Sequence, residues 1–517
     1  MSQSFHVPDS NSEERAHPAH YSIQVTGVII FCGLSLILLY ARSLNNYFQS
    51  DDFILLKWAS AGVLSAFRPT HWEFHRPFTI FILAISYKLF SLCPPAFRLI
   101  LLSFQLANCI LLSCLAQRIT HNRAVSIVTP LLFAFSFYHC EVLLWISCLA
   151  DVLATFFCIL TLLFYSSYRG RGGSIYFFLS IVSFSCAVLS KESALPLFAV
   201  LMAYDFFIGA SSSAQVPHPP TQSLLPRTIA RYIPFAILIG VSMLFKTPTA
   251  VMNPYGKIAV NYTQYILYAF LPFLTTHTQM SWPAPVKILV FSVAAGGLTT
   301  IVKCGGPPIR FLIICFLLLL LPPSMCAVAE ARYLFAPGCI ISIVLASALV
   351  DISCRVSRRL AGLHRRTRNH TPLLSATVLT TICLAVIIPQ ALFVSGRAGD
   401  WASASAIVES IIESVRAVKP YSLAGADTYF VNLPDGIPSR LGYAYIFRNG
   451  IAEALYFAYG GRVGRIEAVR MAGAEGTWRG HREIDIEALK KLSRGNTNIF
   501  VYSPDTQNVK RYGKVGP

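Results

Sequence analysis

Two adjacent carboxylates, Asp51 and Asp52, follow the first long apolar segment of the chain. Each carboxylate resists leaving water and each repels the other, so an adjacent pair beside apolar chain is energetically costly. A carboxylate can act as the general base that takes the proton of an attacking hydroxyl group. The second one can hold a cation or orient the molecule that carries the hydroxyl. The alternative interpretation is a helix N-cap or a solvated loop pair, and the membrane context described below favours the catalytic one.

Three further polar clusters contain cations suited to binding a phosphate. Arg76, in the segment His75-Arg76-Pro77, carries a planar guanidinium that matches phosphate oxygens, and Pro77 suits the start of a helix. Lys191 and Arg332 stand at short polar junctions between apolar segments. The alternatives are an interfacial anchor for Arg76, a self-paired turn for Lys191 and a snorkelling side chain for Arg332.

Carboxylates and an imidazole accompany these cations. Glu192 and Glu330 lie beside them, and His139 and Glu141 precede Asp151, which stands inside an otherwise apolar run. An ionisable residue within a membrane segment is a functional candidate by default. For Asp151, a hydrogen bond between packed helices is the alternative. The sequence contains no P-loop, dinucleotide-binding glycine pattern or metalloprotease helix motif.

The elements that must position these residues are membrane helices. Of the 517 residues, 55% are hydrophobic and 13% charged, whereas soluble domains carry about 25% charged residues. The mean hydropathy is +0.57. We therefore predict an all-α polytopic membrane protein with eleven spans, at 21–41, 96–117, 123–139, 144–167, 175–190, 194–209, 230–247, 286–302, 309–329, 332–353 and 373–396. The net charge of +18 is assigned to topology signals and anionic lipids rather than to nucleic acid.

The distribution of arginines predicts the orientation. The loop at residues 354–370 is the most arginine-rich of the chain and the strongest cytoplasmic marker. With eleven spans, residues 1–20 form a cytoplasmic tail, and all the polar clusters above, including the first outer loop 42–95, gather on the outer face. Two short apolar stretches, 78–92 and 263–275, suit interfacial or re-entrant helices. If both crossed the membrane, there would be thirteen spans.

The end of the chain differs from the membrane segment at residues 21–396. Residues 397–517 are polar, with an amphipathic stripe at 401–418, short strands at 428–433 and 498–503, and a helix at 483–492. We predict a small extracytoplasmic α/β domain that caps the site, grips an acceptor or only stabilises the protein. The 14 cysteines all precede this domain and show no metal-type spacing, so no disulfide framework is predicted. An exported domain without disulfides favours a bacterial inner (plasma) membrane.

In their order and spacing, these motifs resemble the GT-C glycosyltransferases, specifically the protein O-mannosyltransferase-like branch that includes the lipid A aminoarabinose transferases. The resemblance covers residues 21–396 and rests on Asp51-Asp52, on His75-Arg76-Pro77-Phe78, on an "H-x-E…W-I-S…D" pattern at 139–151, and on the segments 190–192 and 332–334. The chain departs from these relatives at Leu149, where they often carry arginine, and lacks the tetratricopeptide repeats of some of them.

The resemblance implies an inverting hexosyl- or pentosyltransferase that moves a sugar from a polyprenyl-phosphate donor to an acceptor hydroxyl on the outer face of the membrane. It implies Asp51 as the base, with Asp52 as second choice. The residues expected to bind the donor phosphate or sugar are His75, Arg76, Lys191, Arg332 and Tyr333. The residues expected to bind the acceptor or a cation are His139, Glu141, Asp151, Glu192 and Glu330. A divalent cation is a candidate cofactor. The expected partners are the bilayer, the lipid donor and a protein, glycan or lipid acceptor.

Other classes of membrane protein remain open. A transporter or flippase of lipid-linked sugars is the main alternative, and it predicts inverted repeats and helices broken near the midplane. A polysaccharide ligase or polymerase uses the same donors but favours arginine and histidine in a long outer loop. A membrane scaffold gives no purpose to Asp51, Asp52 or Asp151. The sequence leaves the sugar, the acceptor and the carrier length open.

Overall fold

The computed structural model describes residues 18–68, 76–209, 224–244, 256–270, 305–326, 329–363, 371–417, 426–439, 442–461, 463–473, 481–493 and 497–512, with isolated positions between 283 and 303. His75, residues 1–17 and most of the predicted span 286–302 lie outside the described residues.

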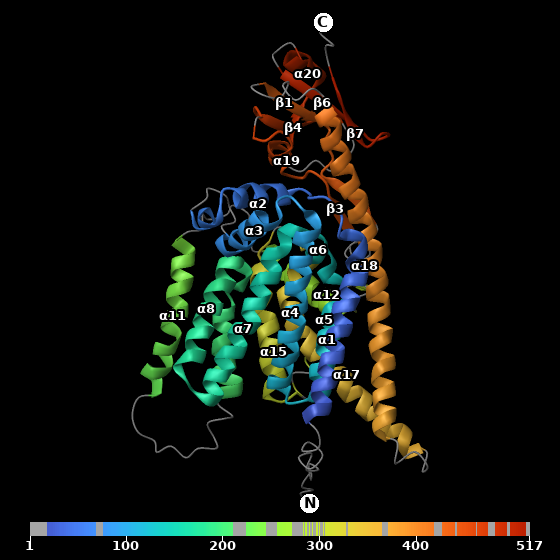
Figure 1. Ribbon diagram of the computed structural model, residues 1–517. Helices are drawn as coiled ribbons and strands as arrows, with labels where there is room; N and C mark the ends of the chain where they lie inside the picture. The colour runs from blue at the N-terminus through green and yellow to red at the C-terminus, as the bar shows by residue number, and fades with distance from the viewer. Residues whose placement is uncertain are drawn as a thin grey trace, which may run out of the picture.

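The described part of the chain is mainly a bundle of apolar helices that run side by side (Figure 1). Its helices are α1 (Pro18–Tyr40), α4 (Pro94–Thr120), α5 (Arg123–Phe135), α6 (Cys140–Leu144), α7 (Leu149–Arg171), α8 (Ser174–Ser190), α9 (Leu197–Tyr204), α11 (Leu224–Leu244), α12 (Gly256–Phe270), α15 (Pro307–Leu319), α16 (Leu321–Ser324), α17 (Phe335–Leu363) and α18 (Thr371–Ala417). The predicted all-α membrane fold is confirmed, and the core lies between these helices.

Local sequence explains where several helices begin. Proline occupies the first turn of α3 (Pro77–Phe90), α4 and α15, where its missing N–H breaks no helical hydrogen bond. The side chain of Asn122 caps α5 by accepting hydrogen bonds from the N–H groups of Ala124 at 2.9 Å and Val125 at 3.2 Å. His121 ends α4 in the left-handed conformation. The short turn at 121–122 therefore reverses the chain between α4 and α5.

The number of long spans among the described residues is smaller than predicted. Seven helices are long and apolar enough to cross a membrane, or eight if Arg123–Phe135 and Phe137–Leu144, which meet at a 51° bend, form one span. The predicted spans at 175–190 and 230–247 correspond to the shorter apolar helices Ser174–Ser190 and Ile229–Met243. The boundary predicted at residue 139 was wrong, because the chain continues through α6 before it turns back at 145–148.

Two helices lie at the upper end of the bundle, across the ends of the long helices (Figure 1). They are α2 (Asp51–Ser60) and α3. The sequence predicted a short interfacial or re-entrant helix at 78–92, and α3 has this length and position. The polar clusters singled out above lie at this end of the bundle.

The opposite end carries the basic residues assigned to the cytoplasm. Arg169 and Arg231 both pair with Asp205, at 2.6 and 3.1 Å. The hydroxyl groups of Tyr165 and Tyr232 each donate to the same carboxylate at 2.7 Å. This cluster joins α7, α11 and the π-helical turn Asp205–Gly209. This cluster and the polar clusters near α2 and α3 thus lie at opposite ends of the bundle.

The last part of the chain forms a sheet above the bundle (Figure 1). The strands are β1 (Asp427–Val431), β4 (Ile466–Met471), β5 (Arg482–Ile484), β6 (Thr497–Ser503) and β7 (Asn508–Arg511), in the order β5-β4-β1-β6-β7. All neighbours are parallel except β6 and β7. Two helices, α19 (Ile451–Ala458) and α20 (Ile486–Ser493), accompany the sheet. The predicted strands and helix of this small α/β region therefore lie close to their expected positions.

The alternation of side chains along the strands explains how this sheet is held. Tyr429, Val431 and Ile499 pack with α20 on one face, whereas Phe430 and Phe500 join the main core on the other. α18 runs without a break past residue 397, where the sequence suggested a boundary, and reaches residue 417. The predicted amphipathic helix at 401–418 is thus the upper part of one long helix.

A two-stranded hairpin lies between this sheet and the bundle. It consists of β2 (Gly436–Ser439) and β3 (Gly442–Tyr445), which pair antiparallel. Arg397 of α18 donates to the carbonyl of Tyr443 at 2.7 Å. This contact fixes β3 against α18 just above the upper end of the bundle.

Candidate active site

Asp52 is a buried structural carboxylate. The residue is only 1% exposed to solvent. One oxygen, Oδ1, accepts from the N–H and the hydroxyl of Ser147 at 2.7 and 2.5 Å, and Oδ2 accepts from the N–H of Gln49 at 3.1 Å. Burial raises the pKa of Asp52 to about 6, against the opposing effects of Ser147 and Arg98. Both oxygens are engaged within the protein, so Asp52 joins α2 to the turn before α7 rather than facing a substrate.

Asp51 is the accessible member of the pair. Its side chain is only partly buried, and its Oδ1 accepts from the side-chain amide of Asn449 at 2.8 Å. Its Oδ2 has no partner among the described residues. Because a general base must reach the proton that it removes, the geometry favours Asp51 over Asp52 for this role.

The backbone ahead of the pair is held in an uncommon conformation. Ser50 has φ 48° and ψ −119°, which non-glycine residues rarely adopt. Its N–H donates to the carbonyl of Ile446 at 3.0 Å. Arg98, fully buried, donates to the carbonyls of Asn46 and Leu144 at 3.0 and 2.7 Å. These contacts hold the chain so that Asp52 points inward and Asp51 outward.

The C-terminal segment at 442–458 docks directly beside the pair. The side-chain amide of Gln49 donates to the carbonyl of Tyr445 at 3.1 Å, and the rings of Phe53 and Phe447 stack at 6.1 Å. Gly450 has a φ of +84°, and a Cβ there would lie 2.3 Å from the carbonyl oxygen of Ser50. Glycine is therefore required for this close approach.

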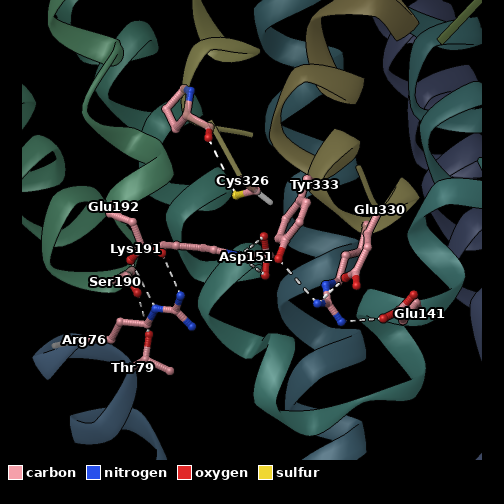
Figure 2. Close-up of polar contacts among 12 residues, drawn as sticks. Arg76, Thr79, Glu141, Asp151, Ser190, Lys191, Glu192, Cys326, Glu330 and Tyr333 are labelled. Carbon is pink, nitrogen blue, oxygen red and sulfur yellow. Dashed lines mark hydrogen bonds and ion pairs between the residues drawn. The ribbon is translucent and has the colours of Figure 1, made fainter. Parts of the chain in front are cut away.

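Two ion pairs extend from α3 toward the centre of the bundle (Figure 2). Arg76 binds Glu192 through two hydrogen bonds of 2.7 and 3.2 Å. Lys191, the preceding residue, binds both oxygens of Asp151 at 2.6 Å. Lys191 is only 6% exposed and Asp151 only 8%, so the two charges neutralise each other away from bulk solvent.

Arg332 holds a second group of charges next to these pairs. Its guanidinium donates to Glu141 at 2.6 Å and also contacts Glu330. It lies over the rings of Trp145 at 5.2 Å and Tyr445 at 5.8 Å. Two carboxylates thus already neutralise the charge of Arg332. A phosphate could bind Arg332 only by displacing at least one of them.

Tyr333 links the two groups of charges. The ammonium of Lys191 lies 5.5 Å from the centre of its ring, and the guanidinium of Arg332 donates to its hydroxyl at 3.4 Å. Figure 2 shows Tyr333 between Asp151 and Glu330. The structure therefore brings most of the predicted site residues together at the upper end of the bundle. We call them the polar row, and its members are Arg76, Glu141, Asp151, Lys191, Glu192, Glu330, Arg332 and Tyr333.

His139 is packed among aromatic rings. It is fully buried and its ring packs against Phe133, Tyr138 and Phe335 at centroid distances of 4.3, 4.7 and 4.6 Å. The prediction that it binds an acceptor or a cation is therefore corrected, because aromatic rings surround it. His75, the other predicted imidazole, lies outside the described residues.

Several residues at the site were not singled out from the sequence. Tyr445, Arg448 and Asn449 come from the C-terminal segment, where no local pattern marks them. Gln49 and Ser147 stand within segments that the sequence did single out, and only their hydrogen bonds to or beside Asp52 show their part.

The candidate divalent cation has no assigned ligand set. Among the described residues, no group of three or more His, Cys, Asp and Glu side chains is arranged to hold a metal ion.

The chain is similar to known proteins in sequence and in structure. No protein-family model matches the chain. It is 29% identical over 227 residues to protein O-mannosyl-transferase TMTC1 of Homo sapiens, covering 37% of this chain and 25% of the relative. Protein O-mannosyl-transferase TMTC1 of Mus musculus is 29% identical over 203 residues, covering 33% and 21%. The chain spans about a quarter of the length of these curated relatives.

Two solved structures are similar over most of the chain. ArnT from Cupriavidus metallidurans, bound to undecaprenyl phosphate, is 13% identical with a TM-score of 0.47, over 93% of this chain and 94% of that chain. The oligosaccharyltransferase of Archaeoglobus fulgidus, tethered with an acceptor peptide, is 12% identical with a TM-score of 0.46, over 86% and 63%. The chain is thus similar to a protein O-mannosyl-transferase, to ArnT and to an oligosaccharyltransferase.

Proposed function

We propose that the protein is a membrane glycosyltransferase that moves a sugar from a polyprenyl-phosphate donor to an acceptor hydroxyl, with inversion. The observation that carries the proposal is the placement of Asp51. It is the partly exposed carboxylate of the pair, and Asn449 orients it. It lies at the end of the bundle where α2 and α3 lie across the ends of the long helices (Figure 1). A lipid-linked donor would bring its phosphate to this depth of the membrane.

The proposed reaction is a direct displacement. Oδ2 of Asp51 takes the proton of the acceptor hydroxyl, whose oxygen forms a bond to the anomeric carbon of the sugar. The bond between that carbon and the phosphate oxygen breaks, and its electron pair leaves with the polyprenyl phosphate. Asp52 keeps the start of α2 in place through Ser147 and Gln49 and takes no part in the proton transfer.

The predicted donor-binding and acceptor-binding groups take different parts in this proposal. Arg76 and Lys191 act through their paired carboxylates, Glu192 and Asp151, and shape the wall of the site. Arg332 does so through Glu141 and Glu330. Breaking such buried pairs leaves an uncompensated charge and is strongly unfavourable. These residues are therefore proposed to preorganise the site.

We also propose which side of the membrane each end of the bundle faces. The polar row would face the outer surface, and the arginine-rich end, with the N-terminus, would face the cytoplasm. A bacterial inner membrane remains the proposed location. The curated relatives are named for protein O-mannosyl transfer, so a mannosyl-phosphate lipid and a protein hydroxyl form the first donor–acceptor pair to test.

The proposal is tested by sugar transfer in a purified system. The protein is reconstituted in lipid nanodiscs with polyprenyl-phosphate hexoses and pentoses, each carrying a radiolabelled sugar, and with protein, glycan and lipid acceptors. We expect transfer from one donor class and release of polyprenyl phosphate in equal amount. Release of neither product from any donor, with nanodiscs that hold folded protein, would contradict the proposal.

A further inference from the structure

The loop between β3 and α19 places a cation beside the candidate base. Arg448 precedes Asn449, whose side chain holds Asp51 at 2.8 Å. The guanidinium of Arg448 donates to the hydroxyl of Tyr445 at 3.4 Å and lies 5.6 Å from the centre of its ring. Asp51 and Glu330 are both close enough to interact electrostatically with Arg448. Arg448 is thus adjacent in sequence to the residue that holds Asp51, and it contacts Tyr445, over whose ring Arg332 also lies.

Arg448 differs from the other cations of the site in its pairing. Arg76, Lys191 and Arg332 each lie within ion-pair distance of a carboxylate. Within the part of the chain that the structure describes, no carboxylate forms an ion pair with Arg448. A negatively charged ligand can therefore bind Arg448 without first displacing a buried carboxylate.

We propose that Arg448, supplied by the C-terminal segment, binds the phosphate of the lipid-linked donor, an inference that rests on the proposed function. A guanidinium can contact two phosphate oxygens at once, and such charge-assisted bonds are the stronger ones. Two adjacent residues of one loop then act on the general base and on the leaving phosphate. Asn449 orients the base, and Arg448 holds the leaving group.

The chemistry at Arg448 follows from the displacement described above. As the bond from the anomeric carbon to the phosphate oxygen breaks, its electron pair moves onto that oxygen. The negative charge on the phosphate group increases by one, while the acceptor proton passes to Asp51. A positive group next to the departing oxygen stabilises this charge most where it develops. Arg448 therefore lowers the barrier as well as binding the donor.

The experiment measures binding and transfer separately. Binding of undecaprenyl phosphate, which carries no sugar, is measured by native mass spectrometry of the full-length protein in nanodiscs. The variants are Arg448→Gln, which removes the charge, Arg448→Lys, which keeps it, and Arg465→Gln as a control on an exposed arginine of the same region. Thermal unfolding confirms that each variant is folded.

We expect Arg448→Gln to weaken binding of undecaprenyl phosphate by roughly tenfold or more, in line with the loss of a charge-assisted hydrogen bond. Arg448→Lys should lose less, and Arg465→Gln should match the unmodified protein. Transfer by Arg448→Gln should fall by a larger factor than binding, because the charge on the phosphate grows during the reaction.

Two results would overturn the inference. One is binding by Arg448→Gln within twofold of the unmodified protein, and the other is an equal loss in Arg465→Gln. Failure of the proposed function would look different, because the unmodified protein itself would then transfer no sugar. If Arg448→Gln does not fold, the comparison of Arg448→Lys with Arg465→Gln decides, since lysine keeps the charge but cannot make the two parallel bonds.

Discussion

At the scale of single residues, the two adjacent carboxylates have different roles because one side chain points into the protein and the other out of it. Asp52 is held by three hydrogen bonds from Gln49 and Ser147, whereas Asp51 is held by one from Asn449. The pair and its membrane context could be predicted from the sequence. The partners could not, because Asn449 follows Asp51 by almost 400 residues.

The buried carboxylate leads to a prediction about pH. The pKa of Asp52 is raised from 3.8 to about 6 in the folded protein. Between these two values the unfolded chain gives up this proton first, so the contribution of Asp52 to stability falls as the pH rises from about 4 to about 6. Asp52→Asn removes this titration. Its stability should therefore decline less than that of the unmodified protein over the same interval.

Thermal unfolding in detergent between pH 4 and pH 7 measures this difference. Comparing the two proteins at each pH cancels the contribution of the other carboxylates, which both share. Asp52→Asn also turns an amide N–H₂ toward the N–H of Gln49, so we expect it to be less stable above pH 6. Unfolding curves that stay parallel throughout would show that Asp52 is not buried as the structure has it.

At the scale of elements, the site depends on how β3 and α19 approach α2. Gly450 combines a φ of +84° with an approach that leaves no room for a Cβ, which would lie 2.3 Å from the carbonyl oxygen of Ser50. Gly460 has a similar φ of +62° but no neighbour within 4 Å of such a Cβ. A substitution at Gly460 therefore tests the effect of backbone strain alone, whereas one at Gly450 adds the loss of the contact with Ser50.

We predict that Gly450→Ala releases the 442–458 segment from α2, whereas Gly460→Ala does not. Both substitutions place alanine in the left-handed region, at a cost of roughly 1–2 kcal/mol. Only Gly450→Ala should increase hydrogen exchange at residues 446–458 and reduce sugar transfer. Equal exchange in the two variants would mean that the close contact at Ser50 does not hold the segment.

Long apolar helices were predictable at this scale, but their breaks were not. A span was expected at 123–139 with the next one starting at 144, yet Arg123–Phe135 and Phe137–Leu144 meet at a 51° bend. The turn after α6 brings Ser147 to Asp52. Apolar composition alone cannot show such a break, since the two parts together are apolar enough to count as one span. The position of α3 was predictable from its length.

At the scale of the whole molecule, the two ends of the bundle carry different charges. The upper end gathers neutralised pairs such as Lys191–Asp151 and the lower end gathers arginines around Asp205. The charge pattern along the sequence predicted this separation. The sequence left open whether the C-terminal region caps the site, grips an acceptor or only stabilises the protein, because its contacts with α2 join segments far apart in the chain.

This arrangement predicts the sidedness of the protein. In a variant without native cysteines, a cysteine at Glu487 should react with a membrane-impermeant maleimide in intact cells. A cysteine at Arg359 should react only after the membrane is opened. Both positions are exposed, so a difference in labelling reports the side of the membrane. Labelling of both in intact cells would contradict the proposed topology.

The most direct test of the central claim is the rate of sugar transfer by Asp51→Asn in a single turnover. Asparagine keeps the shape and the bond to Asn449 but cannot take the acceptor proton. The matched control is Glu487→Gln, an exposed carboxylate of the C-terminal region. We predict that Asp51→Asn binds undecaprenyl phosphate normally and transfers sugar at least about 100-fold more slowly, while the control is unchanged. Transfer by Asp51→Asn within a few-fold of the control would contradict the assignment of Asp51 as the base.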